Sequence, residues 1–282
     1  MNPAADQKRS ADEPIIAVKG LEKSFKLTTV LDGIDLEVAH GQIVGYIGPN
    51  GAGKTTTVKI LIGMLGDFNG AVSVCGFDVA RDPIEVKRRV GYVPETAALY
   101  DALTPGEFLQ FVGRIHGMGS EETERRARAM LGLFDLEDKF DHRMSSFSKG
   151  MRQKVLIVAG LIHNPDLIVM DEPLTGLDAN SAVVVKEILS GLAQRGKTIF
   201  YCSHVMDVVE RVCDRIIILN KGKIIADGSF EELQAGARGA SLEHLFTELT
   251  SEGRHGTTAR RFIDIFDAFD DADNVDSAER AP

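Results

Sequence analysis

The sequence predicts an α/β fold with a mostly parallel core sheet, an antiparallel β part and a helical subdomain. Short apolar runs rich in β-branched residues alternate with stretches of helical spacing, one run leads directly into a glycine-rich loop, and the middle of the chain carries helix signals without a strand. Such runs are typical of strands that are covered on both faces, as in parallel sheets. The runs are Ile43–Ile47, Leu167–Met170, Thr198–Cys202 and Arg215–Leu219.

Two helices are predicted in the first half of the chain. Apolar residues recur at helical spacing over Thr55–Leu65, with Gly66 as the predicted C-terminal stop. Thr104–Glu107 is a capping box with proline at the first helical position, so a second helix should begin there and extend to about His116. We expect residues 101–143 to form a helical insertion between the sheet-forming parts.

The second half of the chain repeats the alternation. A helix is predicted over Ser181–Ala193, ended by Gly196. Asn220–Gly222 has the composition of a tight turn, so the strands Ile216–Leu219 and Lys223–Ala226 should pair as a hairpin.

Composition and charge set the domain organisation. We expect a mobile leader at residues 1–14, a main domain at 15–235 with its helical subdomain at about 98–160, and a C-terminal extension at 236–282 with an acidic tail. The net charge is −10, of which the last 21 residues carry −6. The mildly acidic remainder favours no nucleic-acid partner. The longest apolar stretch, Val155–Ile162, is too short to cross a bilayer.

The glycine-rich loop has the composition of a phosphate-binding loop. Gly48–Thr55 fits G-x-x-x-x-G-K-[ST], with an apolar strand before it and a periodic helix after it. Its glycines allow the backbone N–H groups to turn toward phosphate oxygens, and the helix N-terminus favours an anion. Lys54 would neutralise phosphate charge and the Thr55 hydroxyl would ligate Mg²⁺. A glycine-rich turn that merely caps a strand is the structural alternative, and the flanking pattern disfavours it.

A second chemical feature follows the strand at Leu167–Met170. Asp171 and Glu172 come directly after it, at the sheet edge where open α/β sheets bind ligands. Asp171 would hold Mg²⁺ through water, and Glu172 would act as the general base on an attacking water. A solvated strand end is the alternative, and the phosphate loop makes it the weaker interpretation.

Further motifs resemble the ATP-binding subunit of ABC transporters, in the family's order over roughly residues 15–250. Ser148–Gln153 resembles the signature motif at a helix start, and Thr175–Asp178 resembles the D-loop. His204 resembles the switch histidine, and Phe25 stands where an aromatic residue stacks on adenine. Three positions depart from the pattern: Glu95 stands where the family often has glutamine, and Lys149 and Met151 replace the usual glycine and glutamine of the signature.

The resemblance implies a P-loop NTPase of the ABC ATPase type that binds ATP and Mg²⁺ and hydrolyses ATP. The implied catalytic residues are Lys54, Glu172 and His204, and the implied metal ligands are Thr55, Asp171 and Glu95. The implied ATP contacts are Phe25, Gly48, Pro49, Asn50, Gly51, Ala52, Gly53, Lys54, Thr55, Thr56, Glu95, Ser148, Gly150 and Asp178.

Ser148 and Gly150 carry the partner prediction, because the signature of this family meets the γ-phosphate of ATP held on a second subunit. The resemblance thus implies an ATP-bound dimer, predicted as a homodimer, and a separate integral-membrane permease at the cytoplasmic face of the cell membrane. Tyr92–Glu95, Phe147–Lys154 and Leu242–Phe246 are similar to the exporter branch, which handles drugs, lipids and polysaccharides. Export of an unknown substrate is therefore expected.

Two other functions remain as alternatives. A non-transport ABC ATPase would act on ribosomes or DNA, but the chain has one cassette and lacks long coiled-coil insertions and zinc-ligand spacing. A simple P-loop kinase would have no use for Ser148 and His204. In the C-terminal tail, Arg260–Asp270 has helical apolar spacing and is predicted as one amphipathic helix in an otherwise disordered acidic segment.

Overall fold

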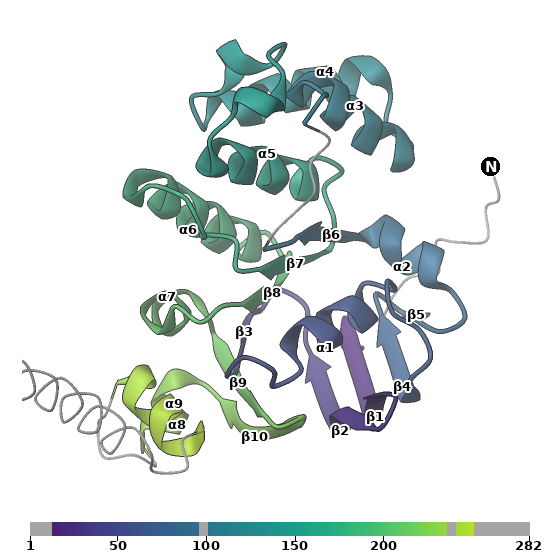
Figure 1. Ribbon diagram of the computed structural model, residues 1–282, viewed down its shortest axis with the longest axis vertical. Coiled ribbons are helices and arrows are strands. Elements are labelled where there is room, and N and C mark those ends of the chain that lie inside the picture. The colour runs from purple at the N-terminus through teal and green to yellow at the C-terminus, as the bar shows by residue number, and fades with distance from the viewer. Residues whose placement is uncertain (1–12, 96–100, 236–240, 251–282) are drawn as a thin grey trace, which may run out of the picture.

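The computed structural model of the chain describes residues 13–95, 101–235 and 241–250. It contains two β-sheets, with helices on both sides of the larger one and a group of helices beyond its end (Figure 1). The predicted leader and most of the predicted C-terminal extension, including the amphipathic segment at 260–270, lie outside the described residues. The division of the chain into domains stays a prediction.

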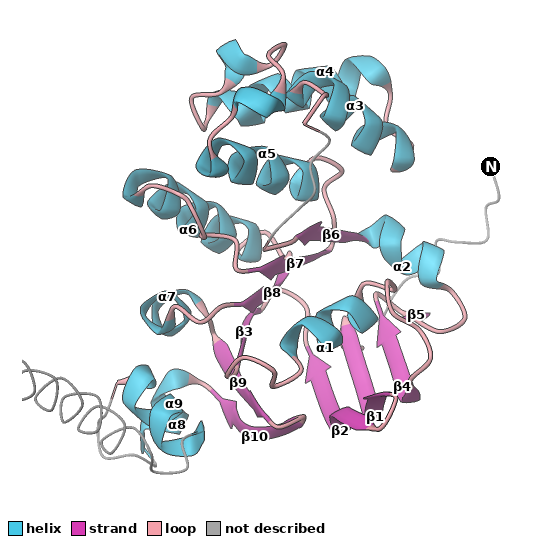
Figure 2. Ribbon diagram, viewed as in Figure 1, coloured by secondary structure: helices cyan, strands magenta, loops and turns pink. Residues whose placement is uncertain are grey.

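The larger sheet is the predicted, mostly parallel core. Its strand order is β10-β9-β3-β8-β7-β6, and all neighbouring pairs are parallel except the β9–β10 hairpin. The residues of β3, β7 and β8 are buried throughout, because helices cover one face and α1 with the smaller sheet covers the other (Figure 2). Its strands are β3 Ile43–Ile47, β6 Val90–Val93, β7 Leu167–Asp171, β8 Thr198–Cys202, β9 Arg215–Asn220 and β10 Lys223–Gly228.

The smaller sheet is the antiparallel part, with strand order β2-β1-β4-β5 (Figure 2). Its inward side chains share one apolar core with inward residues of the larger sheet, including Tyr46 and Phe200, whose rings lie 5.0 Å apart. Both sheets therefore belong to one packed body. Its strands are β1 Ile16–Phe25, β2 Thr28–Val38, β4 Asn69–Val74 and β5 Phe77–Asp78.

The helices occupy three places. Helix α1 lies between the two sheets, α6 and α7 cover the opposite face of the larger sheet, and α3 to α5 form the helical part beyond β6 (Figure 1). Two short 3₁₀ turns, Glu137–Lys139 and Met144–Ser146, connect α4 to α5. The helices are α1 Lys54–Leu61, α2 Pro83–Arg89, α3 Pro105–Ile115, α4 Ser120–Gly132, α5 Lys149–Leu161, α6 Ala179–Ala193, α7 Met206–Val212, α8 Phe230–Ala235 and α9 Leu242–Thr250.

The local predictions from the sequence mostly match the structure. In the capping box of α3, Thr104 Oγ1 accepts the Glu107 N–H at 3.1 Å and Glu107 Oε2 accepts the Thr104 N–H at 2.9 Å. The turn between β9 and β10 has positive φ at both Lys221 and Gly222 (47° and 79°), as tight hairpins require. Within the described part of 101–143, the structure has helices and turns and no strand, as predicted.

The prediction for α1 was wrong at its C-terminal end. The helix ends at Leu61 rather than Leu65, because Gly63 adopts the left-handed conformation (φ 67°) and breaks the helix before Gly66. The N–H groups of Met64 and Leu65 then both turn back to the Lys59 carbonyl, at 2.8 and 3.0 Å. An earlier glycine thus provides the stop that the apolar spacing assigned to a later one.

Candidate functional site

The C-terminal ends of β3, β7 and β8 bring together segments that are far apart in the sequence. Because these strands are parallel and run in the order β3-β8-β7, the phosphate loop, Glu172 and His204 reach one sheet edge. They line a cleft of about 520 Å³, here called the phosphate cleft. Its lining residues are Gly48, Pro49, Asn50, Lys54, Thr55, Glu95, Glu172, His204, Met206, Glu243, Phe246 and Thr247.

The phosphate loop owes its shape to its glycines. Gly51 and Gly53 have positive φ, 80° and 114°, which residues with a side chain rarely adopt. A Cβ on Gly53 would also lie 2.6 Å from Leu31 Cδ2, so the loop packs directly on β2. Lys54 folds across the loop and donates to the Gly48 carbonyl at 2.6 Å and to the Pro49 carbonyl at 3.2 Å. Its ammonium group thus lies where a phosphate in the loop needs a compensating positive charge.

Glu172 is the most constrained acidic residue of the site. Its backbone has a positive φ of 50°, its side chain is buried, and its N–H donates to the Cys202 carbonyl at 2.9 Å. Its Oε2 accepts the Ser203 hydroxyl at 3.0 Å, and its Oε1 lies 2.7 Å from His204 Nδ1. Strained backbone that neighbouring groups hold in place is typical of functional sites. Both carboxylate oxygens are therefore fixed in orientation beside the phosphate loop.

Ser203 was not identified from the sequence. It is buried at the end of β8, donates to Glu172 and accepts the Val205 N–H at 3.1 Å. Its position next to the predicted switch histidine was the only available signal. Four further residues of the cleft were also missed, because the helices that carry them are brought to it by tertiary packing: Met206, Glu243, Phe246 and Thr247.

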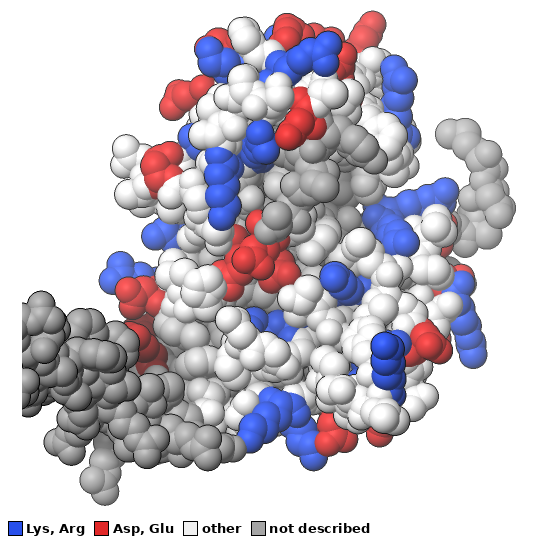
Figure 3. Space-filling view, viewed as in Figure 1, with Lys and Arg blue, Asp and Glu red and all other residues white. Residues whose placement is uncertain are grey.

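Asp171 lies behind Glu172 at the end of β7. Burial and the negative charges of Glu172 and Glu95 raise the pKa of its carboxyl group to about 6, and the nearby Lys54 opposes this shift. Acidic side chains also gather near the centre of the face in Figure 3, between the helical part and the sheets. A cation beside this carboxyl group would stabilise its charged form.

The signature and D-loop residues lie apart from the phosphate cleft. Ser148 caps α5, with its Oγ accepting the Met151 N–H at 3.2 Å, and is exposed. Gly150 packs against the D-loop so closely that a Cβ would lie 2.6 Å from the Gly176 carbonyl oxygen. Asp178 caps α6, and its bonds to the Ser181 N–H and hydroxyl lower its pKa to about 2. None of these three residues lines the phosphate cleft of its own chain.

Four other predicted site residues differ in how exposed they are. Phe25 is 45% exposed at the end of β1, with Lys23 Nζ 5.1 Å from its ring centre, and it does not line the phosphate cleft. Thr56 is half-buried in α1. Ala52 is buried beneath the loop, and Glu95 is exposed at the edge of the cleft.

Comparisons with known proteins agree with this architecture. The ABC transporter family model matches residues 31–175. The ABC transporter ATP-binding protein NatA of Bacillus subtilis (strain 168) is 39% identical over 223 residues, which are 78% of this chain and 90% of NatA. The Nod factor export ATP-binding protein I of Ralstonia nicotianae is 39% identical over 220 residues, 78% of this chain and 68% of that protein.

Solved structures show the same fold. The structure of an ATP-binding subunit of an ABC transporter has a TM-score of 0.80 and 36% identity, and the match covers 84% of this chain and all of that one. A dimeric post-hydrolysis structure of the cassette MJ0796 with ADP and phosphate has a TM-score of 0.71 and 25% identity, covering 76% and 98%. Fold and site together define an ATP-binding cassette, and the chain belongs to the ABC transporter family. Within that family it is an ATP-binding subunit with ATP hydrolase activity.

Proposed function

We propose that Glu172 is the general base of ATP hydrolysis and that Lys54 and the phosphate loop hold the phosphates of ATP. The observation that carries this proposal is the Ser203–Glu172–His204 arrangement beside the loop. Glu172 takes a proton from water, the water oxygen bonds to the γ-phosphorus, and the bond from that phosphorus to the bridging oxygen of ADP breaks. ATP and water thus give ADP and phosphate.

His204 and Ser203 act on Glu172 in this proposal. Both contact its carboxylate, so they hold the base in one orientation while the water is placed against it. The side chain of His204 is 69% exposed and extends to the rim of the cleft. It is therefore placed to contact the terminal phosphate as well as the base.

Thr55, Asp171 and Glu95 suit Mg²⁺, because hydroxyl and carboxylate oxygens are its preferred protein ligands. Among the described residues, no three histidines, cysteines or acids form a metal cage on their own. Mg²⁺ in nucleotide sites typically takes one or two protein ligands and completes its shell with phosphates and water. When bound, the ion would neutralise negative charge on the phosphates. It would also reduce the repulsion among the three acids Asp171, Glu172 and Glu95.

We further propose that two copies of the chain enclose ATP between them. Ser148 and Asp178 lie outside the phosphate cleft of their own chain, and the free N–H groups at the start of α5 form an anion site. In a head-to-tail dimer these groups would reach the γ-phosphate held by the other copy. The dimeric relative with ADP and phosphate supports this arrangement.

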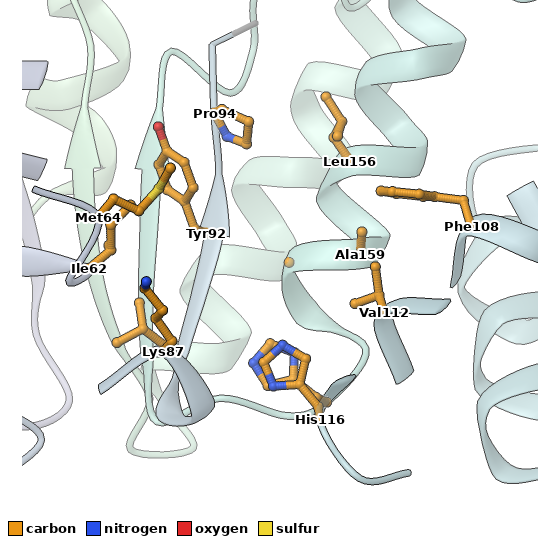
Figure 4. Close-up of a pocket in the computed structure, with 13 residues that line it drawn as sticks. Ile62, Met64, Lys87, Tyr92, Pro94, Phe108, Val112, His116, Leu156 and Ala159 are labelled. Carbon is orange, nitrogen blue, oxygen red and sulfur yellow. The ribbon is translucent and has the colours of Figure 1, made fainter. Parts of the chain in front are cut away.

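A second cavity offers a place for a membrane partner. An apolar groove of about 500 Å³ lies between the core and the helical part, with Met64 and Tyr92 on one wall and Phe108 and Leu156 on the other (Figure 4). Pro94 lines this groove, and the next residue, Glu95, lines the phosphate cleft. A helix bound in the groove would therefore lie against Pro94, whose neighbour Glu95 lines the nucleotide site.

We propose that this helix belongs to a separate permease, so that ATP binding and hydrolysis drive export at the cytoplasmic face of the cell membrane. In the described part of the chain, no helix is both long and apolar enough to span a bilayer. Relatives named for Nod factor export and daunorubicin resistance support export as the direction.

Copurification tests the transport proposal. The Glu172→Gln chain is isolated with Mg²⁺ and ATP in mild detergent from its native cells, and its partners are identified by mass. A stoichiometric multi-span membrane protein is expected. Phe108→Ala, which opens the groove, should reduce its recovery, whereas Phe111→Ala removes an exposed ring from the same helix and should not. Recovery of ribosomal proteins or DNA-repair factors, without a membrane partner, would contradict transport.

A further inference from the structure

Helix α9 forms a wall of the phosphate cleft. Phe246 and Thr247 follow Glu243 by three and four residues, so the three side chains share one side of the helix. They line the cleft together with the phosphate loop and His204. On its other side, Leu242 and Leu245 are buried in the same apolar core as Val209 of α7. The helix is thus held by packing against α7 and contributes side chains to the nucleotide site.

Helix α7, against which α9 packs, follows His204 directly in the chain. Helix α7 begins at Met206, two residues after His204, and both Met206 and Phe246 line the cleft. Glu210, near the C-terminal end of α7, accepts the Leu242 N–H through its Oε2 at 3.3 Å. This hydrogen bond and the shared apolar core therefore connect α7 to α9.

His204 depends on this support for its position. With 69% of its side chain exposed, His204 is not fixed by burial, and its side chain is held by the 2.7 Å hydrogen bond to Glu172. Helix α7 has only seven residues, and a helix this short is not stable without packing. The surface that α9 covers is thus part of what keeps the backbone after His204 in place.

We propose that α9 is a positioning element for His204 and through it for Glu172, so that the C-terminal extension acts on ATP hydrolysis rather than on ATP binding. Leu245 and the Leu242–Glu210 bond anchor α9 on α7, and α7 follows His204 directly in the chain. This inference rests on the proposed roles of Glu172 and His204. It identifies the segment Leu242–Phe246 as part of the hydrolysis machinery.

Matched substitutions on α9 test the proposal in the full-length protein. Leu245→Ala removes a buried anchor, and Leu249→Ala makes the same change at an exposed position one turn later. We expect Leu245→Ala to lower kcat at least about tenfold, because small displacements of positioned groups cost that much or more, with the Kd for ATP changed less than about twofold. Leu249→Ala should match the wild type, and Leu245→Met, which keeps the volume, should restore kcat.

A double-mutant comparison separates positioning from general damage. In a His204→Ala background, Leu245→Ala should cause little further loss of kcat, since the group that α9 positions is already absent. An equal fold-loss in both backgrounds, or a parallel loss of ATP affinity, would overturn the proposal. If Leu245→Ala does not fold, Glu210→Ala, which removes the acceptor of the Leu242 N–H, gives the same comparison. Unchanged kcat in both His204→Ala and Glu172→Gln would instead refute the proposed catalytic roles themselves.

Discussion

A stacked histidine pair at the lower end of the apolar groove makes the stability of this protein sensitive to acid. The rings of His116 and His163 lie 3.6 Å apart with an angle of 14° between their planes, and both line the groove (Figure 4). Burial, and secondarily the adjacent His116, lower the pKa of His163 from 6.5 to about 4. Because the fold favours the neutral ring, stability from this site is present above pH 6.5 and is lost as the pH falls toward 4.

The magnitude follows from the difference in pKa. Between pH 6.5 and pH 5 the unfolded chain protonates His163 while the folded chain keeps it neutral. This interval of 1.5 pH units corresponds to about 2 kcal/mol at 1.36 kcal/mol per unit. The value is an upper bound, since part of the residue reaches solvent and water reduces the effect.

Urea unfolding at pH 7.5 and pH 5, without nucleotide, measures this effect. His163→Phe removes the titrating group and keeps a ring stacked on His116. From pH 7.5 to pH 5, the free energy of unfolding of the wild type should fall by up to about 2 kcal/mol more than that of this variant. His142→Phe, at an exposed position, leaves the stacked pair intact and serves as the control substitution. Identical pH dependence of the wild type and His163→Phe would show that His163 does not cause the acid sensitivity.

Three further substitutions and one control test the nucleotide site and the packing of α5 on the D-loop. Lys54→Ala should weaken ATP binding at least about tenfold in a fluorescent-nucleotide titration, and unchanged affinity would exclude the assigned role. Glu172→Gln should lower kcat about a hundredfold or more while ATP still binds, whereas wild-type turnover would remove Glu172 as the base. Gly150→Ala places a Cβ 2.6 Å from the Gly176 carbonyl and should cost about 1–3 kcal/mol in urea unfolding. Gly191→Ala, with open space around its Cβ, should cost nothing, and equal losses would contradict the packing argument.

Much of the fold could be predicted because its signals are local. The apolar strands β3, β7 and β8 and the capping box of α3 depend on residues within a few positions of one another. Placing Asp171, Glu172 and His204 at one edge required only that these strands be parallel. The end of α1 was mispredicted because backbone conformation at Gly63, and not apolar spacing, terminates the helix.

The parts that were missed depend on contacts between distant segments. Ser203 acquires its role only when β8 lies beside β7 and its hydroxyl meets Glu172, 31 residues away. The positive φ of Glu172 has no sequence signal, because glutamate is not a residue that favours this conformation. Phe246 reaches the cleft through the packing of α9 on α7, and the apolar groove forms only where α3 and α5 meet the core.

We proposed above that two copies of the chain enclose ATP and that its hydrolysis depends on Glu172. Sedimentation equilibrium of the Glu172→Gln protein, with Mg²⁺ and either ATP, ADP or no nucleotide, tests this ATP-bound dimer. We expect the 30.6 kDa monomer without nucleotide and with ADP, and a species of twice that mass with ATP. A monomer in all three conditions, at concentrations where ATP is bound, would contradict it.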